Sequence, residues 1–62
     1  MKIFSRFSVM FNNCYFPPAT EFMLESVEDN DAFISWKNKD HNQKGSFILN
    51  RKSKDYQRFM SL

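Results

Sequence analysis

The lone cysteine is the feature that most constrains how this chain can fold. Because Cys14 is the only thiol among the 62 residues, the chain cannot close a disulfide within itself. One cysteine and one histidine, His41, also fall short of the four ligands of a structural zinc site. A chain this short buries only about 60% of the surface that its unfolded form exposes. It therefore depends on apolar packing or self-association, and we expect a single small domain over residues 1–62 with no cofactor.

Aromatic residues are the main source of that packing. The chain has eight phenylalanines, two tyrosines and one tryptophan, and each buried ring removes roughly 150–250 Å² of surface from water. So many rings exceed what a globule of this size can hide. We therefore expect some of them to be exposed in an interaction patch or buried between copies in a homo-oligomer, most simply a homodimer.

The first segment predicts a strand over residues 2–11, because apolar side chains alternate onto one face. The side chains on the inner face are Ile3, Phe7, Val9 and Phe11. Asn12 and Asn13 then supply turn chemistry. The Pro17-Pro18 pair after them enforces an extended, non-helical connection.

Three further runs predict an antiparallel meander. Residues 20–28 alternate as a strand, although Thr20 could instead cap a helix, and an acidic turn follows at 28–31. Residues 32–37 form the second strand. Residues 38–45 form a polar loop, in which Gly45 redirects the chain through a left-handed backbone. Residues 46–50 pair back on the second strand.

After the meander, Ser53 can cap a short helix whose apolar stripe packs on the sheet. That stripe consists of Tyr56, Phe59 and Met60. Frayed coil is the alternative, because one or two turns are marginal without packing, and the fold is then nearly all β. The predicted fold class is α+β and β-rich, with a small antiparallel sheet of three to four strands and a short C-terminal helix.

Charge is unevenly distributed along the chain. Residues 21–31 carry five acidic side chains, whereas residues 32–62 carry seven basic side chains against Asp40 and Asp55. In a meander the acidic turn and the 38–45 loop lie at opposite ends of the sheet, so the poles are separated in space. Such a surface can orient self-association or a charged partner, although ordinary solubilising charge accounts for the same pattern.

Three kinds of reactive site fail on residue type or spacing. Cys14 and His41 are the only possible nucleophile and base, and no oxyanion-hole glycine accompanies the cysteine. Glu25, Glu28, Asp29 and Asp31 match an acidic turn rather than a calcium loop or a glycosidase pair. The tripeptide Lys44-Gly45-Ser46 lacks the upstream glycine of a phosphate-binding loop. We therefore predict no enzyme activity and no metal or cofactor site.

Location is predicted from the same residues. No apolar run approaches the roughly 18 residues of a membrane span, and Ser5, Arg6 and Ser8 interrupt the only stretch that resembles a signal peptide. With an unpaired thiol, the predicted location is the cytoplasm.

Function is predicted from what the surface must do. We expect a small non-enzymatic protein-binding regulator or inhibitor that occupies the surface of a partner protein and self-associates. Abundant Asn, Lys, Phe and Ile with a single Gly are typical of AT-rich genes such as those of phages and mobile elements; in that case the partner is a host protein. Trp36 and Phe47, near the polar loop, are the predicted exposed anchors.

The alternative prediction is a module that binds single-stranded nucleic acid. The C-terminal half interleaves basic residues with rings, which suits phosphate contacts beside stacked bases. Arg51 and Lys52 are the main phosphate candidates. The full set of candidate partner-binding residues is Trp36, Phe47, Lys37, Lys39, Arg51, Lys52, Tyr56 and Arg58.

Overall fold

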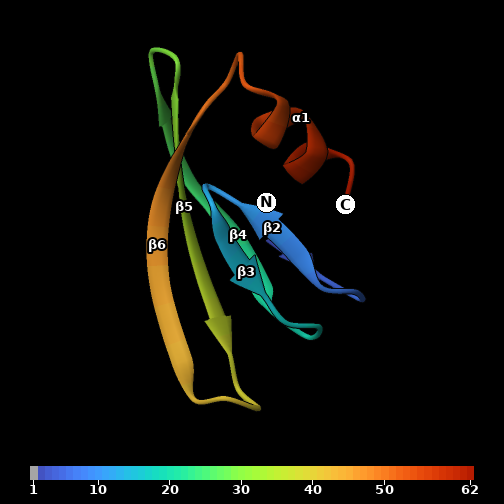
Figure 1. Ribbon diagram of the computed structural model, residues 1–62. Helices are drawn as coiled ribbons and strands as arrows, with labels where there is room; N and C mark the ends of the chain where they lie inside the picture. Colours follow the sequence, from blue (N-terminus) through green and yellow to red (C-terminus); the bar gives the residue numbers. More distant parts are fainter. Residues whose placement is uncertain (1) are drawn as a thin grey trace.

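Antiparallel strands make up most of the chain in the computed structural model, which describes residues 2–62 (Figure 1). In chain order the elements are β1 (Lys2–Phe4), β2 (Val9–Phe11), β3 (Cys14–Phe16), β4 (Glu21–Glu28), β5 (Asp31–Asn38), β6 (Gln43–Asn50) and α1 (Lys54–Met60). This is the predicted α+β, β-rich class with one short C-terminal helix. Within the described residues, no helix is long and apolar enough to span a membrane.

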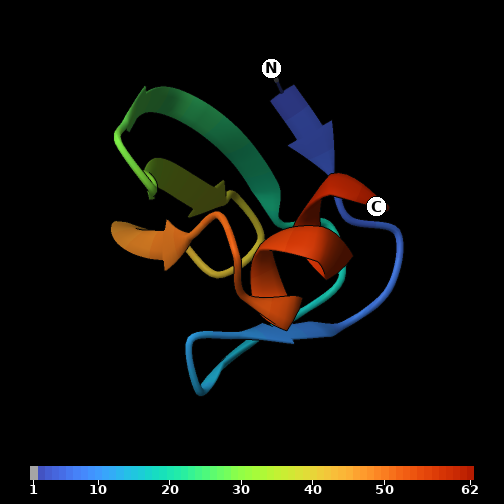
Figure 2. The same ribbon diagram turned by 90° about the horizontal axis from the view of Figure 1, so that it is seen from above.

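The strands form one four-stranded sheet and one separate hairpin. The sheet has the order β1-β4-β5-β6 with every neighbouring pair antiparallel, and β2 pairs only with β3. The predicted meander of three strands is therefore confirmed as β4-β5-β6, with β1 added at its other side. Seen from above, the sheet curves around the hairpin and α1, which lie on its concave side (Figure 2).

Asparagine and aspartate make the tight turns. Asn12 and Asn13 join β2 to β3 with φ values of 52° and 61°, and positive φ at both central residues defines the turn that suits a two-residue hairpin. Asp29, with φ 54°, begins the turn between β4 and β5. Both turns lie where the sequence predicted them, because short polar side chains tolerate the left-handed backbone.

The first segment is not the single strand that the alternation predicted. It divides into β1 and β2 because the chain bends at Arg6 and Phe7. Ser5, just before the bend, is buried, and its backbone is bonded to Ala19 and Thr20 by two hydrogen bonds of 2.9 Å. Its hydroxyl also donates to the carbonyl of Phe7. The chain therefore turns across the sheet, and Phe7, predicted to be on the inner face, is 74% exposed.

The segment around Thr20 is a strand, as the alternation favoured. Thr20 does not cap a helix; its buried hydroxyl donates to the carbonyl of Pro17 at 2.6 Å and accepts from Asn38 Nδ2 at 3.1 Å. Those two bonds satisfy the hydroxyl inside the fold. They also hold the Pro17-Pro18 connection against the end of β5.

The predicted loop over residues 38–45 is shorter than expected. β5 continues through Asn38 and β6 begins at Gln43, so the loop covers residues 39–42, and its left-handed residue is Asn42, with φ 50°. Gly45 lies inside β6 opposite Trp36. A Cβ built on Gly45 would lie 2.9 Å from Trp36 Nε1, so the glycine makes room for the indole and does not turn the chain.

The core lies between the sheet, the hairpin and the helix, and it is largely aromatic. Its buried apolar members are Phe11, Phe16, Phe22, Ala32, Ile34, Leu49 and Phe59. Phe22 contacts the rings of Phe11 and Phe59 edge to face, both at 5.9 Å or less between centroids, a favourable aromatic geometry. Side chains from β2, β4 and α1 thus meet at one point.

The C-terminal helix forms as predicted. The hydroxyl of Ser53 accepts from the backbone N–H of Tyr56 at 3.1 Å and caps α1. Phe59 is fully buried and Tyr56 is half-buried, but Met60 is 43% exposed. The predicted stripe is therefore only partly correct, because a helix of seven residues turns one narrow side toward the core.

Candidate protein-binding surface

One face of the four-stranded sheet has no covering layer among residues 2–62. The hairpin and α1 both lie on the other side of the sheet (Figures 1 and 2). Side chains alternate along a strand and paired residues share a face, so the strand register defines the uncovered side. We call it the open face; its members are Lys2, Phe4, Glu21, Met23, Ser26, Glu28, Asp31, Phe33, Ser35, Lys37, Lys44, Ser46, Ile48 and Asn50.

The open face carries apolar side chains that the core does not use. Phe33 on β5 is paired with Ile48 on β6, and Ile48 is 50% exposed. Met23 is half-buried on β4, and Phe4 is 61% exposed on β1. All four strands thus contribute one apolar residue to a surface that water reaches, and such a surface marks an interaction site when its members are close together.

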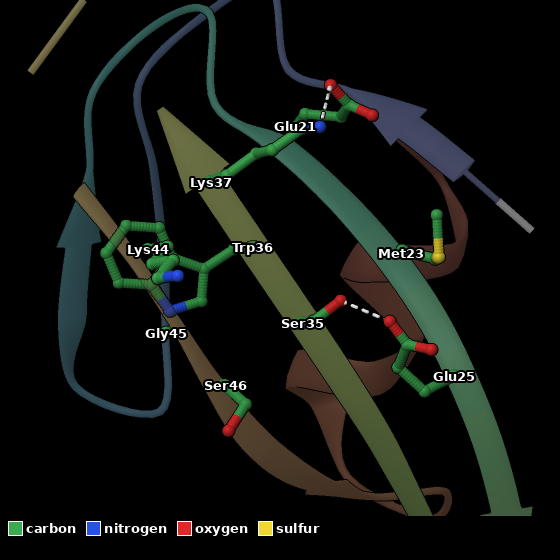
Figure 3. Close-up of a pocket in the computed structure, with 9 residues that line it drawn as sticks. All are labelled: Glu21, Met23, Glu25, Ser35, Trp36, Lys37, Lys44, Gly45 and Ser46. Atoms are coloured by element: carbon green, nitrogen blue, oxygen red, sulfur yellow. Dashed lines mark hydrogen bonds and ion pairs between the residues drawn. The ribbon is translucent and has the colours of Figure 1, made fainter. Parts of the chain in front are cut away.

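A shallow hollow of about 480 Å³ lies across the face between β4 and β6 (Figure 3). Met23, Ser35 and Ser46 are among the residues that line it, and charged residues lie around them. Ser35 donates a 2.6 Å hydrogen bond to Glu25, which follows Leu24 at a β-bulge. That bond holds the Glu25 carboxylate on the open side of the sheet.

Ion pairs fix the end of the hollow at the start of β4. Glu21 accepts from Lys2 at 2.9 Å and lies 3.9 Å from Lys37. The hydrogen bond from Lys2 lowers the pKa of Glu21 below its ordinary value of 4.5, and the charges of Lys37 and Lys39 act in the same direction. Lys44 is paired with Lys37 across β5 and β6, so two like charges lie side by side at this end.

Trp36 and Phe47, the predicted anchors, lie on the covered side of the sheet. The Trp36 ring packs edge to face on Phe16 with 5.1 Å between centroids. The centroid of the Phe47 ring lies 5.5 Å from that of Phe16 and 6.2 Å from that of Phe22. Both side chains are half-buried against the core cluster, which leaves only their outer edges accessible to a partner.

The basic candidates do not form one patch. Lys37 and Lys39 lie at the 39–42 loop, whereas the backbone N–H of Arg51 donates to the carbonyl of Asn30 at 2.7 Å. Arg51 and Lys52 therefore lie beside the acidic turn, at the opposite end of the sheet. The predicted separation of the acidic turn from the 39–42 loop is correct, but the basic residues after β6 join the acidic end because β6 runs back to it.

Tyr56 is half-buried against the core cluster, whereas Arg58 belongs to the contact between the helix and the hairpin. The guanidinium of Arg58 lies 5.6 Å from the centre of the Phe11 ring and donates to the carbonyl of Met10. Asp55 accepts from the backbone N–H of Asn12 at 3.0 Å. These contacts fasten α1 to the hairpin, so Arg58 has a structural role in the chain's own fold.

The residues considered for chemistry lie apart in the fold. Cys14 is exposed on β3, and His41 lies in the 39–42 loop with its Nδ1 3.2 Å from Asn38 Oδ1. In residues 2–62 no hydrogen bond joins Cys14 to His41, and no group of three His, Cys, Asp or Glu side chains could hold a metal ion.

The chain matches no protein-family model, no curated protein and no solved structure.

The open face was not among the sites predicted from the sequence, although the strands that form it are apolar on both sides. Met23, Phe33 and Ile48 alternate with the core residues of their strands and are themselves apolar. A strand that is apolar on both sides is expected to be covered on both sides. Apolar residues on both sides of these strands are therefore the sequence signal that could have identified this face.

Proposed function

We propose that this chain is a small non-enzymatic protein-binding regulator or inhibitor that covers part of a partner protein with its open face, and that it also self-associates. One observation carries the proposal: four strands present Phe4, Met23, Phe33 and Ile48 on a sheet face that no second layer covers within residues 2–62. A central apolar area with a polar rim is the usual composition of a protein interface.

Charge on the open face favours a protein over a nucleic acid as the partner. Glu21 and Glu25 lie on the same side as Lys37 and Lys44. Carboxylates next to lysines repel a phosphate backbone, whereas a protein surface can match both signs.

The single-stranded nucleic-acid alternative has weaker support. Stacking needs rings displayed beside phosphate-binding side chains, but Trp36 and Phe47 pack on the core. Arg51 and Lys52 lie beside the acidic turn, away from Lys37. Nuclease treatment in the experiment below distinguishes the two partners.

The test is affinity capture from a lysate of the source or its host, with and without nuclease, using matched variants. Phe33→Ser removes a ring from the open face, and Tyr15→Ser removes an exposed ring from the hairpin surface. We expect wild type and Tyr15→Ser to retain the same protein after nuclease treatment. Phe33→Ser should bind it at least about tenfold more weakly, as for an interface anchor.

Two results contradict the proposal. Retention that disappears with nuclease and falls steeply with salt identifies nucleic acid as the partner. Equal retention by Phe33→Ser and wild type places the binding surface elsewhere. Circular dichroism of both variants shows that the comparison is made between folded proteins.

A further inference from the structure

The free edge of β6 is the longest unpaired strand edge in the described part of the chain. The sheet order places β6 at one side, and all eight of its residues pair with β5 in one continuous register. The strand contains no proline and only one charged residue, Lys44. β1, at the other side, has three residues. Natural sheets usually protect such an edge with charges, prolines or bulges, and β6 has almost none of these.

The hydrogen-bond pattern shows which backbone groups of β6 point away from β5. Arg51 donates to Asn30, which makes these two residues a hydrogen-bonded pair. Hydrogen-bonded pairs alternate along an antiparallel ladder, so Gly45 and Phe47 direct their backbone groups toward β5. Lys44, Ser46 and Ile48 direct theirs outward. The outward carbonyl of Asn50 already accepts from the backbone N–H of Ser53 at 2.9 Å and from its hydroxyl at 2.6 Å. At this residue only the outward N–H is therefore free to pair with a second strand.

We propose that β6 of a second copy of this chain pairs antiparallel with this edge, about a two-fold axis at Phe47, to form one continuous eight-stranded sheet. In this register Ser46 lies opposite Ile48 of the second copy, and Lys44 lies opposite its Asn50. Every outward-pointing residue therefore meets another outward-pointing residue, as a hydrogen-bonded ladder requires. The inference deepens, and rests on, the self-association in the proposed function.

Charge identifies a second copy as the occupant and sets its direction. Lys44 lies at the 39–42 end of β6, and Asn50 is paired with Asp31 at the acidic end. Antiparallel pairing places Lys44 of each copy opposite Asn50 and one strand away from Asp31 of the other, on the open face that all three share. Arg51 follows Asn50 at that end, and by alternation its side chain falls on the covered face. Parallel pairing brings Lys44 against Lys44. Opposite charges across an interface fix its register and orientation. An isologous contact also closes after two copies.

The joined sheet would also enlarge the open face. Ile48 and Phe33 point to that face and lie next to the seam, so the apolar residues of two copies become neighbours on one surface. A dimer of this form presents a continuous area across two chains to the partner of the proposed function.

Amide hydrogen exchange of the wild-type protein, read by NMR at several concentrations, tests the inference directly. The N–H groups of Gly45 and Phe47 are protected within one chain, so their protection should not depend on concentration. The N–H groups of Ser46, Ile48 and Asn50 should become protected only as the dimer forms, because each faces a free carbonyl of the second copy. Light scattering on the same samples should report twice the mass of one chain, and salt should weaken the association.

Matched proline variants provide the second test. Ser46→Pro removes an outward N–H that β5 does not use, a position where a strand tolerates proline. Lys54→Pro places proline at the first position of α1, where the N–H has no helical partner. We expect Ser46→Pro to weaken dimerisation at least tenfold. The substitution removes two symmetric hydrogen bonds, one donated by the Ser46 N–H of each copy. Lys54→Pro should dimerise like wild type.

A protein that stays monomeric at millimolar concentration overturns the inference. So does a dimer in which Ser46, Ile48 and Asn50 gain no protection, or one that Ser46→Pro leaves unchanged. If Ser46→Pro does not fold, Ser46→Lys and Ser26→Lys, two exposed serines on the same face, replace the proline pair.

These outcomes are separate from those of the proposed function. A dimer without a captured protein refutes the partner and leaves the edge pairing intact. Captured protein that binds along β6 of a monomer identifies an extended segment of that protein as the occupant and refutes the second copy.

Discussion

Replacing Gly45 with alanine should destabilise the protein, although the same change in an ordinary strand stabilises it. Glycine in a strand costs roughly 0.5–1 kcal/mol relative to alanine, and Gly45 does not have positive φ. Backbone arguments alone therefore predict a gain from Gly45→Ala.

Packing against Trp36 reverses the sign of the stability change expected for Gly45→Ala. The new Cβ would lie 2.9 Å from Trp36 Nε1 and 3.0 Å from Trp36 Cε2, closer than such atoms normally approach. The indole cannot simply move away from β6, because its centroid already lies 5.1 Å from that of Phe16. Overpacking of this kind costs roughly 1–3 kcal/mol. Subtracting the backbone gain leaves a net loss of about 0–2.5 kcal/mol.

Thermal unfolding measures the loss. For a domain of this size, each kcal/mol of lost stability corresponds to a fall in Tm of roughly 4–8 °C. Trp36 is the only tryptophan, so its fluorescence reports independently whether the ring has moved. In a Trp36→Leu background the added methyl group meets no indole, and Gly45→Ala should be neutral or stabilising there. A higher Tm for Gly45→Ala in the wild-type chain would refute the steric argument.

Four further predictions follow from the core, the helix and the ion pairs. Phe22→Ala should cost roughly 3–5 kcal/mol, a large share of the about 3–9 kcal/mol expected for a 62-residue domain, and urea unfolding followed by circular dichroism should show this loss. Ser53→Ala should cost about 1 kcal/mol in urea unfolding, and Ser53→Asp should retain the cap; equal losses in both variants would show that the cap is unimportant. Arg58→Ala should cost about 1–2 kcal/mol, since it removes a cation–π contact and a hydrogen bond, and faster amide exchange in the hairpin than in β5 should accompany it. In an NMR titration the pKa of Glu21 should lie below its ordinary value of 4.5, and it should move back toward that value in Lys2→Gln. Because this pKa is lowered in the folded state, the stability that the carboxylate contributes is present above the unfolded-state pKa. That stability is lost as the pH falls through the folded-state pKa.

Local chemistry made most of the elements predictable. Asn12-Asn13 and the 28–31 cluster marked turns, and Ser53 marked the start of the helix. Each of these signals acts within a few residues, through a preferred backbone angle or a single capping hydrogen bond. The meander followed because turns of this length leave the next strand no place except beside the previous one.

Features that depend on distant residues were predicted less well. The alternation of residues 2–11 predicts one strand, but the chain bends at Arg6 and Phe7, after Ser5 has bonded to Ala19 and Thr20. Gly45 was expected in a turn, and only the position of Trp36 on the adjacent strand explains it. The sequence predicted one basic set of residues in the C-terminal half. Because β6 runs back along the sheet, Arg51 and Lys52 lie at the opposite end from Lys37 and Lys39.

The lone cysteine determined that this chain must be held together without an internal staple, and the many rings determined that side-chain packing replaces it. Both conclusions follow from composition, because they concern which interactions are available. Only the tertiary structure decided which rings form the core, which face of the sheet stays uncovered and which strand ends at a free edge. These depend on where the β2–β3 hairpin and α1 pack, and both lie on one side of the sheet because Phe11, Phe22 and Phe59 meet there.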